Sequence, residues 1–283
     1  MSSPGSRDSA SPATGPAHPE TPLPLPLRLY RSARVAVHIA EGLVTTAVVF
    51  PWVGVPKKQA LIRRWCRRLL YMLKVEARIH GLTGSGLPGN LLIVANHISW
   101  LDIFVLNTVQ PSRFIAKAEL RRWPVAGRLI AGCGTLFIER ERRQDTLKVN
   151  RHAAEALSRG DVIAIFPEGT TTDGRNVLPF HGSLLQPVVD AGGHVQPIAI
   201  RYLKASGEHN DAPAYVGETS FMASFWCVTG ERTLVVELHV AAPLPARARH
   251  RRELSLAAEA AIRTALASPE GGRGPGTPGD RGV

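Results

Sequence analysis

Apolar and polar positions alternate along most of the chain with the periods of short strands and helices. Helical patterns recur between the apolar runs, near residues 103–109, 125–130, 146–158 and 183–190. The runs apolar enough to form strands buried on both faces are LLIVAN (91–96), SRFIAK (112–117), GTLFIER (134–140), DVIAIFPEG (161–169) and HVQPIAIRY (194–202). This alternation predicts an α/β fold, with a largely parallel mixed sheet flanked by helices and a later strand, 233–240, at an edge.

Residues 35–55 form an apolar run about as long as a bilayer-spanning helix requires, with basic residues on both sides. His38 and Glu41 are costly at membrane depth, and Pro51 interrupts the end of the run. Three interpretations therefore stay open: a transmembrane helix, a shallow or re-entrant membrane helix, and a helix buried in the protein core.

Residues 57–75 predict a basic amphipathic helix. Apolar side chains recur four positions apart, while seven lysines and arginines supply positive charge without a single acidic residue; the apolar positions are Leu61, Trp65, Leu69 and Leu73. A solvated helix normally mixes both signs of charge, so we expect contact with anionic headgroups, worth roughly 1 kcal/mol per basic residue. The alternative is a charged face on a helix that packs against the core.

Composition and charge narrow the picture further. Residues 1–27 and 268–283 are rich in Pro, Gly and Ser and are expected to be disordered tails, which leaves a membrane-associated helical region over 28–80 and a globular domain over 81–267. The net charge of +11 implies a negatively charged partner. The three cysteines lack the spacing of a zinc site or disulfide framework and are expected to be buried or half-buried thiols; they are Cys66, Cys133 and Cys227.

The candidate chemistry lies where the strand 91–96 ends, because α/β proteins place ligands beyond the carboxyl ends of strands. His97 and Asp102 are five positions apart, which would separate them by about 140° on one helix. They can meet only across a strand-to-helix turn, where Asp102 would fix the imidazole tautomer and leave the other nitrogen to accept a hydroxyl proton. A structural hydrogen bond is the alternative.

Two more segments carry charged residues at strand ends. FPEGT (166–170) holds Glu168 between a proline and a glycine, as expected for a rigid loop rather than a helix surface. GTLFIER (134–140) ends in Arg140, whose guanidinium can bind a phosphate through two parallel hydrogen bonds.

Together, NHISWLD, GTLFIER, FPEGT and VQPIAI resemble the four ordered blocks of the glycerolipid acyltransferase family, over residues 90–202. The best-known members of that family acylate 1-acylglycerol-3-phosphate. The resemblance implies that 81–267 is the catalytic domain, with His97 as general base and Asp102 as the residue that orients it. It also implies a substrate site formed by Arg140, Glu168, Gly169, Thr170, Lys117 and Pro197. Lys117 can equally be a solvated lysine.

The resemblance further implies direct attack of the acceptor hydroxyl on a thioester, with acyl-CoA or acyl-carrier protein as donor and neither metal nor cofactor. Ser99 and Cys133 lack the surroundings of a covalent nucleophile, so an acyl-enzyme is the lesser alternative. A long acyl chain must be kept from water, which predicts an apolar groove near the amphipathic helix.

A lysophospholipid acceptor resides in a bilayer, so we expect contact with membrane lipids, at the cytoplasmic face of a bacterial inner membrane. Lyso-ornithine lipid is an alternative acceptor. A membrane-recruited scaffold or nucleic-acid-binding module is disfavoured, because aromatic residues make up only 6% of the chain and do not interleave with a basic face. Neither function would use His97, Asp102 and Glu168 together.

Overall fold

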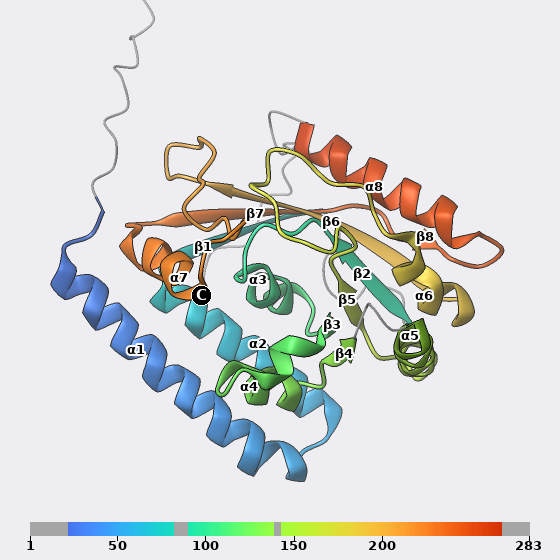
Figure 1. The fold of residues 1–283 in the computed structure, drawn as a ribbon, viewed down its shortest axis with the longest axis horizontal. Coiled ribbons are helices and arrows are strands. Elements are labelled where there is room, and N and C mark those ends of the chain that lie inside the picture. The colour runs from blue at the N-terminus through green and yellow to red at the C-terminus, as the bar shows by residue number, and fades with distance from the viewer. Residues whose placement is uncertain (1–21, 82–89, 139–142, 268–283) are drawn as a thin grey trace, which may run out of the picture.

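The computed structural model describes residues 22–81, 90–138 and 143–267, which fold around one eight-stranded mixed sheet (Figure 1). The strands are β1 (Val75–Gly81), β2 (Leu91–Ala95), β3 (Arg113–Lys117), β4 (Leu136–Ile138), β5 (Ile163–Ile165), β6 (His194–Leu203), β7 (Leu234–Val240) and β8 (Leu244–Pro245). Their order is β1-β7-β6-β2-β5-β3-β4, with β8 also paired to β6. All pairs are parallel except β6–β7 and β6–β8, which confirms the predicted fold class.

Helices cover both faces of the sheet (Figure 1). They are α1 (Leu25–Val44), α2 (Val55–Met72), α3 (Asp102–Val109), α4 (Ala126–Gly132), α5 (Arg143–Ser158), α6 (Gln186–Asp190), α7 (Phe221–Gly230) and α8 (Arg251–Ala267). Short π or 3-10 segments are η1 (Thr45–Val49), η2 (Phe50–Trp52), η3 (Ala118–Arg122) and η4 (Gly182–Leu185). One core cluster packs α2 and α3 against the sheet, and a second packs α5, α6 and α8 against its opposite face.

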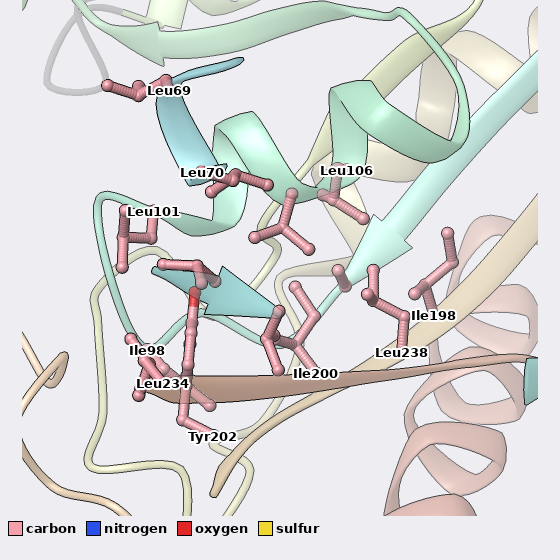
Figure 2. Close-up of a cluster of buried hydrophobic side chains, with 14 of the residues drawn as sticks. Leu69, Leu70, Ile98, Leu101, Leu106, Ile198, Ile200, Tyr202, Leu234 and Leu238 are labelled. Carbon is pink, nitrogen blue, oxygen red and sulfur yellow. The ribbon is translucent and has the colours of Figure 1, made fainter. Parts of the chain in front are cut away.

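Strand β2 lies in the middle of the sheet and is buried along its whole length. Leu91, Ile93 and Ala95 belong to the core cluster on the α3 side, whereas Leu92 and Val94 belong to the cluster on the α8 side. This is why its sequence is apolar throughout rather than alternating. Figure 2 shows part of the cluster on the α3 side, where leucines of α2 and α3 lie over residues of β6 and β7.

The predicted position of strand 233–240 at a sheet edge was wrong. β7 lies between β1 and β6, and β1 forms the edge. β1 was missed because four of its seven residues in succession are exposed, so its sequence lacks a clear apolar pattern. The region 28–80 expected to be helical therefore overlaps the sheet from Val75 onward.

The N-terminal apolar run forms a hairpin with α2. His38 is 1% exposed, its Nε2 lies 3.0 Å from the Trp65 carbonyl, and its ring stacks on the Trp65 ring at 4.5 Å. Glu41 accepts from Arg68 Nη1 at 3.0 and 2.9 Å. The two polar residues that are costly at membrane depth therefore face α2.

The helical segment Leu25–Trp52 is long and apolar enough to cross a membrane by its length and composition, and only 22% of its most apolar stretch is buried. The interpretation as a buried core helix is therefore wrong. The helix leaves a row of large apolar side chains exposed, among them Leu25, Leu29, Tyr30, Val37, Val44 and Trp52. This apolar helix indicates membrane association.

Helix α2 is amphipathic, as predicted. Leu69 and Leu73 are buried and Trp65 is half-buried, while Arg64 and Arg67 are exposed. Through the ion pair between Arg68 and Glu41, the basic side of α2 contacts α1.

Candidate active site

The turn between β2 and α3 carries the candidate catalytic residues. Asn96, directly after β2, is 1% exposed and spans to β6: its Nδ2 donates to the Ile200 carbonyl at 3.0 Å and its Oδ1 accepts from Ile200 N at 2.7 Å. The side-chain amide thereby continues the pairing of β2 with β6 by one step. The two hydrogen bonds of Asn96 fix the position at which the chain leaves the sheet. Residues 97–101 then lead to the start of α3.

Asp102, the first residue of α3, is fully buried and accepts hydrogen bonds on both carboxylate oxygens. Oδ2 accepts from Ile98 N at 2.7 Å and Ser99 N at 2.9 Å, and it lies 2.8 Å from His97 Nδ1. Oδ1 accepts from the Tyr202 hydroxyl at 2.7 Å. Because Asp102 is the acceptor in these bonds, Nδ1 of His97 carries the proton and donates, which leaves Nε2 with the lone pair.

His97 joins this turn to the FPEGT loop. Its ring stacks on Phe166 at 3.9 Å, its backbone N donates to Glu168 Oε1 at 2.7 Å, and its carbonyl accepts from Thr172 N at 2.8 Å. The side chain is 20% exposed, so a substrate can reach it. The structure therefore brings together the two segments that are 71 positions apart in the sequence.

Glu168 is 4% exposed, and both its carboxylate oxygens are bonded to backbone amides. Oε1 accepts from His97 N, and Oε2 accepts from Leu178 N at 2.8 Å. Burial raises the pKa of Glu168, and these two amide donors offset part of that rise. Glu168 thus ties its loop to His97, so any influence on the acceptor acts through the shape of the loop.

The remaining predicted site residues occupy different surroundings. Gly169 follows Glu168 with a φ of +79°, which favours glycine, and Thr170 is exposed beside it. Lys117 is exposed at the end of β3. Arg140 lies outside the described residues.

Pro197 is buried in the middle of β6, opposite Val94. Its carbonyl accepts from Ala241 N at 3.1 Å, so its nitrogen faces the same side of the strand. There it falls between the stretches of β6 that pair with β7 and β8, where a missing N–H is tolerated.

Sequence reasoning missed Tyr202 as a site residue. Burial and the neighbouring Asp102 carboxylate raise the pKa of Tyr202 well above its usual value, so its hydroxyl stays protonated and donates. Figure 2 shows the side chain extending from β6 toward Leu101 in the turn. Side chains alternate between the two faces of β6, so Tyr202 lies on the same face as Ile198 and Ile200. This alternation was the sequence signal that could have placed Tyr202 in the core. Phe166 was quoted within FPEGT, but no pattern indicated its stacking on His97.

Two side chains considered as covalent nucleophiles are poorly placed for that role. Burial raises the pKa of the Cys133 thiol to about 11, which keeps it protonated at neutral pH. Ser99 is fully buried, and its hydroxyl oxygen accepts from Leu101 N at 3.3 Å. Cys66 is buried and Cys133 half-buried, as expected, whereas the prediction was wrong for Cys227, which α7 exposes.

Known proteins are similar to this chain in sequence and in fold. The Acyltransferase family model matches residues 76–201. A lyso-ornithine lipid O-acyltransferase of Pseudomonas aeruginosa is 39% identical over 245 residues, which cover 84% of this chain and 93% of that protein. A 1-acyl-sn-glycerol-3-phosphate acyltransferase of Neisseria gonorrhoeae is 36% identical over 208 residues, which cover 62% of this chain and 81% of that protein.

The solved structure of PlsC, the 1-acyl-sn-glycerophosphate acyltransferase of Thermotoga maritima, has the same fold, with a TM-score of 0.63 at 22% identity. The likeness covers 86% of this chain and 96% of that protein. The fold, the family model and the extended identity to curated relatives agree with the resemblance found in the four sequence blocks. The chain belongs to the acyltransferase family, among its lysophospholipid O-acyltransferases.

Proposed function

We propose that this enzyme transfers a fatty acyl group from acyl-CoA or acyl-carrier protein to the free hydroxyl of 1-acylglycerol-3-phosphate, which yields phosphatidic acid. The observation that carries the proposal is the 2.8 Å contact between His97 Nδ1 and the fully buried Asp102, in a turn where His97 remains accessible. A histidine held in this way presents Nε2 as a base to a bound alcohol.

In the proposed reaction, Nε2 of His97 takes the proton of the acceptor hydroxyl while the hydroxyl oxygen adds to the thioester carbonyl. The tetrahedral oxyanion then collapses, the carbon–sulfur bond breaks, and the imidazolium returns the proton to the departing thiolate. Asp102 stabilises the imidazolium between the two steps. The products are the ester and the free thiol of the carrier, and no group of the enzyme is acylated.

Positioning is the second contribution of the site. The four bonds to Asp102 and the stacking of His97 on Phe166 fix the imidazole before substrate binds. A base already aligned with its alcohol avoids much of the entropy cost of a bimolecular encounter. Arg140 remains our candidate for the acceptor phosphate, with Lys117 and Thr170 as further contacts and Pro197 in the part of the fold that supports the donor side.

An apolar cavity of about 60 Å³ lies among α1, α2, α3 and α4, and we propose it as the inner end of an acyl-chain groove. Most of its lining is apolar or aromatic and includes Phe50, Leu61, Trp65, Phe104 and Leu129. At about two water volumes, it is too small for a long acyl chain as it stands. Binding of a chain therefore requires the α1–α2 hairpin or α4 to shift outward.

The N-terminal hairpin fits a role at the membrane surface, and we place it at the cytoplasmic face of a bacterial inner membrane. The exposed apolar residues of α1 would enter the lipid while Arg64 and Arg67 of α2 meet anionic headgroups. A lysolipid acceptor then stays in the bilayer while its hydroxyl is presented to the enzyme.

Lyso-ornithine lipid is a second candidate acceptor, favoured by the 39% identity to the P. aeruginosa enzyme over most of both chains. The ornithine headgroup carries a carboxylate and an amino group where the first candidate carries a phosphate. The chemistry at His97 is the same for both acceptors, so the difference lies in the headgroup contacts.

A product analysis distinguishes the two acceptors. Purified enzyme is incubated with either lysolipid and with acyl-CoA or acyl-carrier protein, and the products are identified by mass spectrometry. We expect phosphatidic acid at the higher rate, and product formation lowered by about 10²–10⁴-fold in His97→Ala. Faster acylation of lyso-ornithine lipid would replace the first acceptor by the second, whereas no acylation of any lysolipid would contradict the proposed reaction.

A further inference from the structure

Two histidines and a glutamate meet near the outer edge of the sheet, away from the catalytic turn. His80 comes from the edge strand β1, and Glu237 and His239 come from the neighbouring strand β7. One possible ligand atom from each side chain lies within 4.8 Å of the other two. This is the one such group of metal-binding side chains found among the described residues.

The strand register explains why these three side chains meet. β1 and β7 are parallel, and the register pairs His80 directly with His239, so the two side chains lie beside each other. Their rings stack at 4.8 Å with 16° between the planes. Glu237 precedes His239 by two positions on one strand and therefore projects from the same face of the sheet.

This face is opposite to the one that supports Asp102. Val236, Leu238 and Val240, which alternate with Glu237 and His239, belong to the core cluster that contains Tyr202. The three polar side chains thus point to the α8 side of the sheet. Substitutions there can be tested without touching the His97 turn.

Each of the two imidazoles has a buried nitrogen without a hydrogen-bond partner in the part of the chain that the structure describes. Nε2 of His80 and Nε2 of His239 are both buried, and neither has a hydrogen-bond partner among the described residues. The nearest carboxylate oxygen to the second of these atoms, Glu237 Oε2, is 3.6 Å away, beyond hydrogen-bond distance. Buried nitrogens of this kind are costly to leave unpaired, and a coordinated cation would satisfy them.

Arg201 fixes the carboxylate of the group, because its Nη2 donates to Glu237 Oε2 at 2.6 Å. Such an outer contact is common for carboxylates that bind metals, since it sets their orientation. The guanidinium charge also repels a cation, so we expect moderate rather than very tight affinity.

We propose that His80, Glu237 and His239 bind one late first-row divalent cation, of which Zn²⁺ is the best match. Two imidazoles and one carboxylate are a frequent zinc ligand set, and water can complete the coordination. The bound ion would join edge strand β1 to β7. Since β1 directly follows α2, it would also brace the base of the N-terminal hairpin.

Zinc titration of the full chain tests this proposal. Protein freed of metal by a chelator is titrated with Zn²⁺ in a calorimeter, and we expect saturable binding of one ion per chain. His80→Gln and His239→Gln should each weaken binding about tenfold or more. His152→Gln, which changes an exposed histidine of α5, is the matched control and should bind as the wild type does.

Two readouts guard against a variant that fails to fold. Zn²⁺ should raise the melting temperature of the wild type and of His152→Gln, but not that of a folded His80→Gln. Co²⁺ should give the wild type a visible absorption band that His80→Gln lacks. No saturable binding to the wild type, or equal affinity in wild type and His80→Gln, would overturn the proposal.

Discussion

The catalytic turn and the N-terminal hairpin hold their charged residues in different ways. In the turn, the carboxylate of Asp102 is fully buried and takes part in four hydrogen bonds from backbone and side chains. In the hairpin, Glu41 pairs with Arg68, and their side chains are 49% and 52% exposed. A buried, fully bonded network is rigid, whereas an exposed ion pair is worth about 0–1 kcal/mol.

We infer that the two regions have separate roles: the turn carries the reaction, and the hairpin determines where the enzyme binds. In the proposed function, the sheet fixes the atoms that move a proton, while the hairpin presents a surface that can adjust to lipid. Substitutions in the turn should therefore lower turnover, and substitutions in the hairpin should change membrane binding or acyl-chain preference.

The largest effect is expected for His97→Ala. Loss of a general base lowers turnover by about 10²–10⁴-fold, and the partly exposed ring should leave the melting temperature nearly unchanged. Activity and thermal melting are measured beside His152→Ala, an exposed histidine of α5. Turnover close to that of the wild type would remove His97 from the catalytic role.

Asp102→Asn should lower turnover on the order of 10²-fold and also destabilise the fold. The amide group of asparagine places a donor against one of the donors that now face the carboxylate, at a cost of about 1–3 kcal/mol. Denaturant unfolding and initial rates measure the two effects, with the exposed Asp190→Asn as control. A variant that lost stability but kept full turnover would make Asp102 purely structural.

For the hairpin, replacing Arg64 and Arg67 together by glutamine should weaken binding to anionic vesicles by about 30-fold, at roughly 1 kcal/mol per basic residue. High salt should weaken the wild type in the same direction. Vesicle sedimentation is the measurement, and the matched control is Arg151→Gln with Arg159→Gln, at one exposed arginine of α5 and one directly after it. An equal loss of vesicle binding in the two double variants would mean that the net charge of the protein, and not the position of the arginines on α2, governs binding.

Tyr202→Phe removes one of the four bonds to Asp102 and should lower turnover by about 5–10-fold, equivalent to about 1 kcal/mol. The Michaelis constant of the acceptor should change little, because Tyr202 is fully buried and acts through Asp102. A raised Michaelis constant with unchanged turnover would contradict this positioning role. Tyr71→Phe, at an exposed tyrosine, is the control.

The smallest effect is expected in the cavity. Leu129→Ala should shift preference a few-fold toward longer acyl donors and Leu129→Phe toward shorter ones, because Leu129 lines the cavity between α1 and α4. Competition between donors of different length, followed by product mass spectrometry, measures the shift. Leu256→Ala, at an exposed leucine of α8, should leave the preference unchanged.

The sequence predicted the buried strands well because their apolar runs have one explanation, burial on both faces. It failed for β1, whose residues from Glu76 to Ile79 are exposed and carry no strand period. It placed β7 at the edge for the same reason, since the true edge was not recognised.

Site residues could be predicted where residues of suitable chemistry lie close together in the sequence, as His97 and Asp102 do across one turn. Partners from distant segments were harder to find. Tyr202 donates to Asp102 from a strand 100 positions away, and His80 meets His239 only through the register of β1 and β7. Such pairs depend on strand order, which local patterns do not encode.

Direct activation of the lysolipid hydroxyl by His97, without an acyl-enzyme, is the central claim. Wild-type enzyme is mixed with acyl-CoA in the absence of acceptor, and released thiol and intact protein mass are followed together. We predict an unmodified protein mass and no burst of thiol until lysolipid is added. A burst of one thiol per enzyme with a matching acyl adduct, formed before any acceptor is present, would contradict the mechanism.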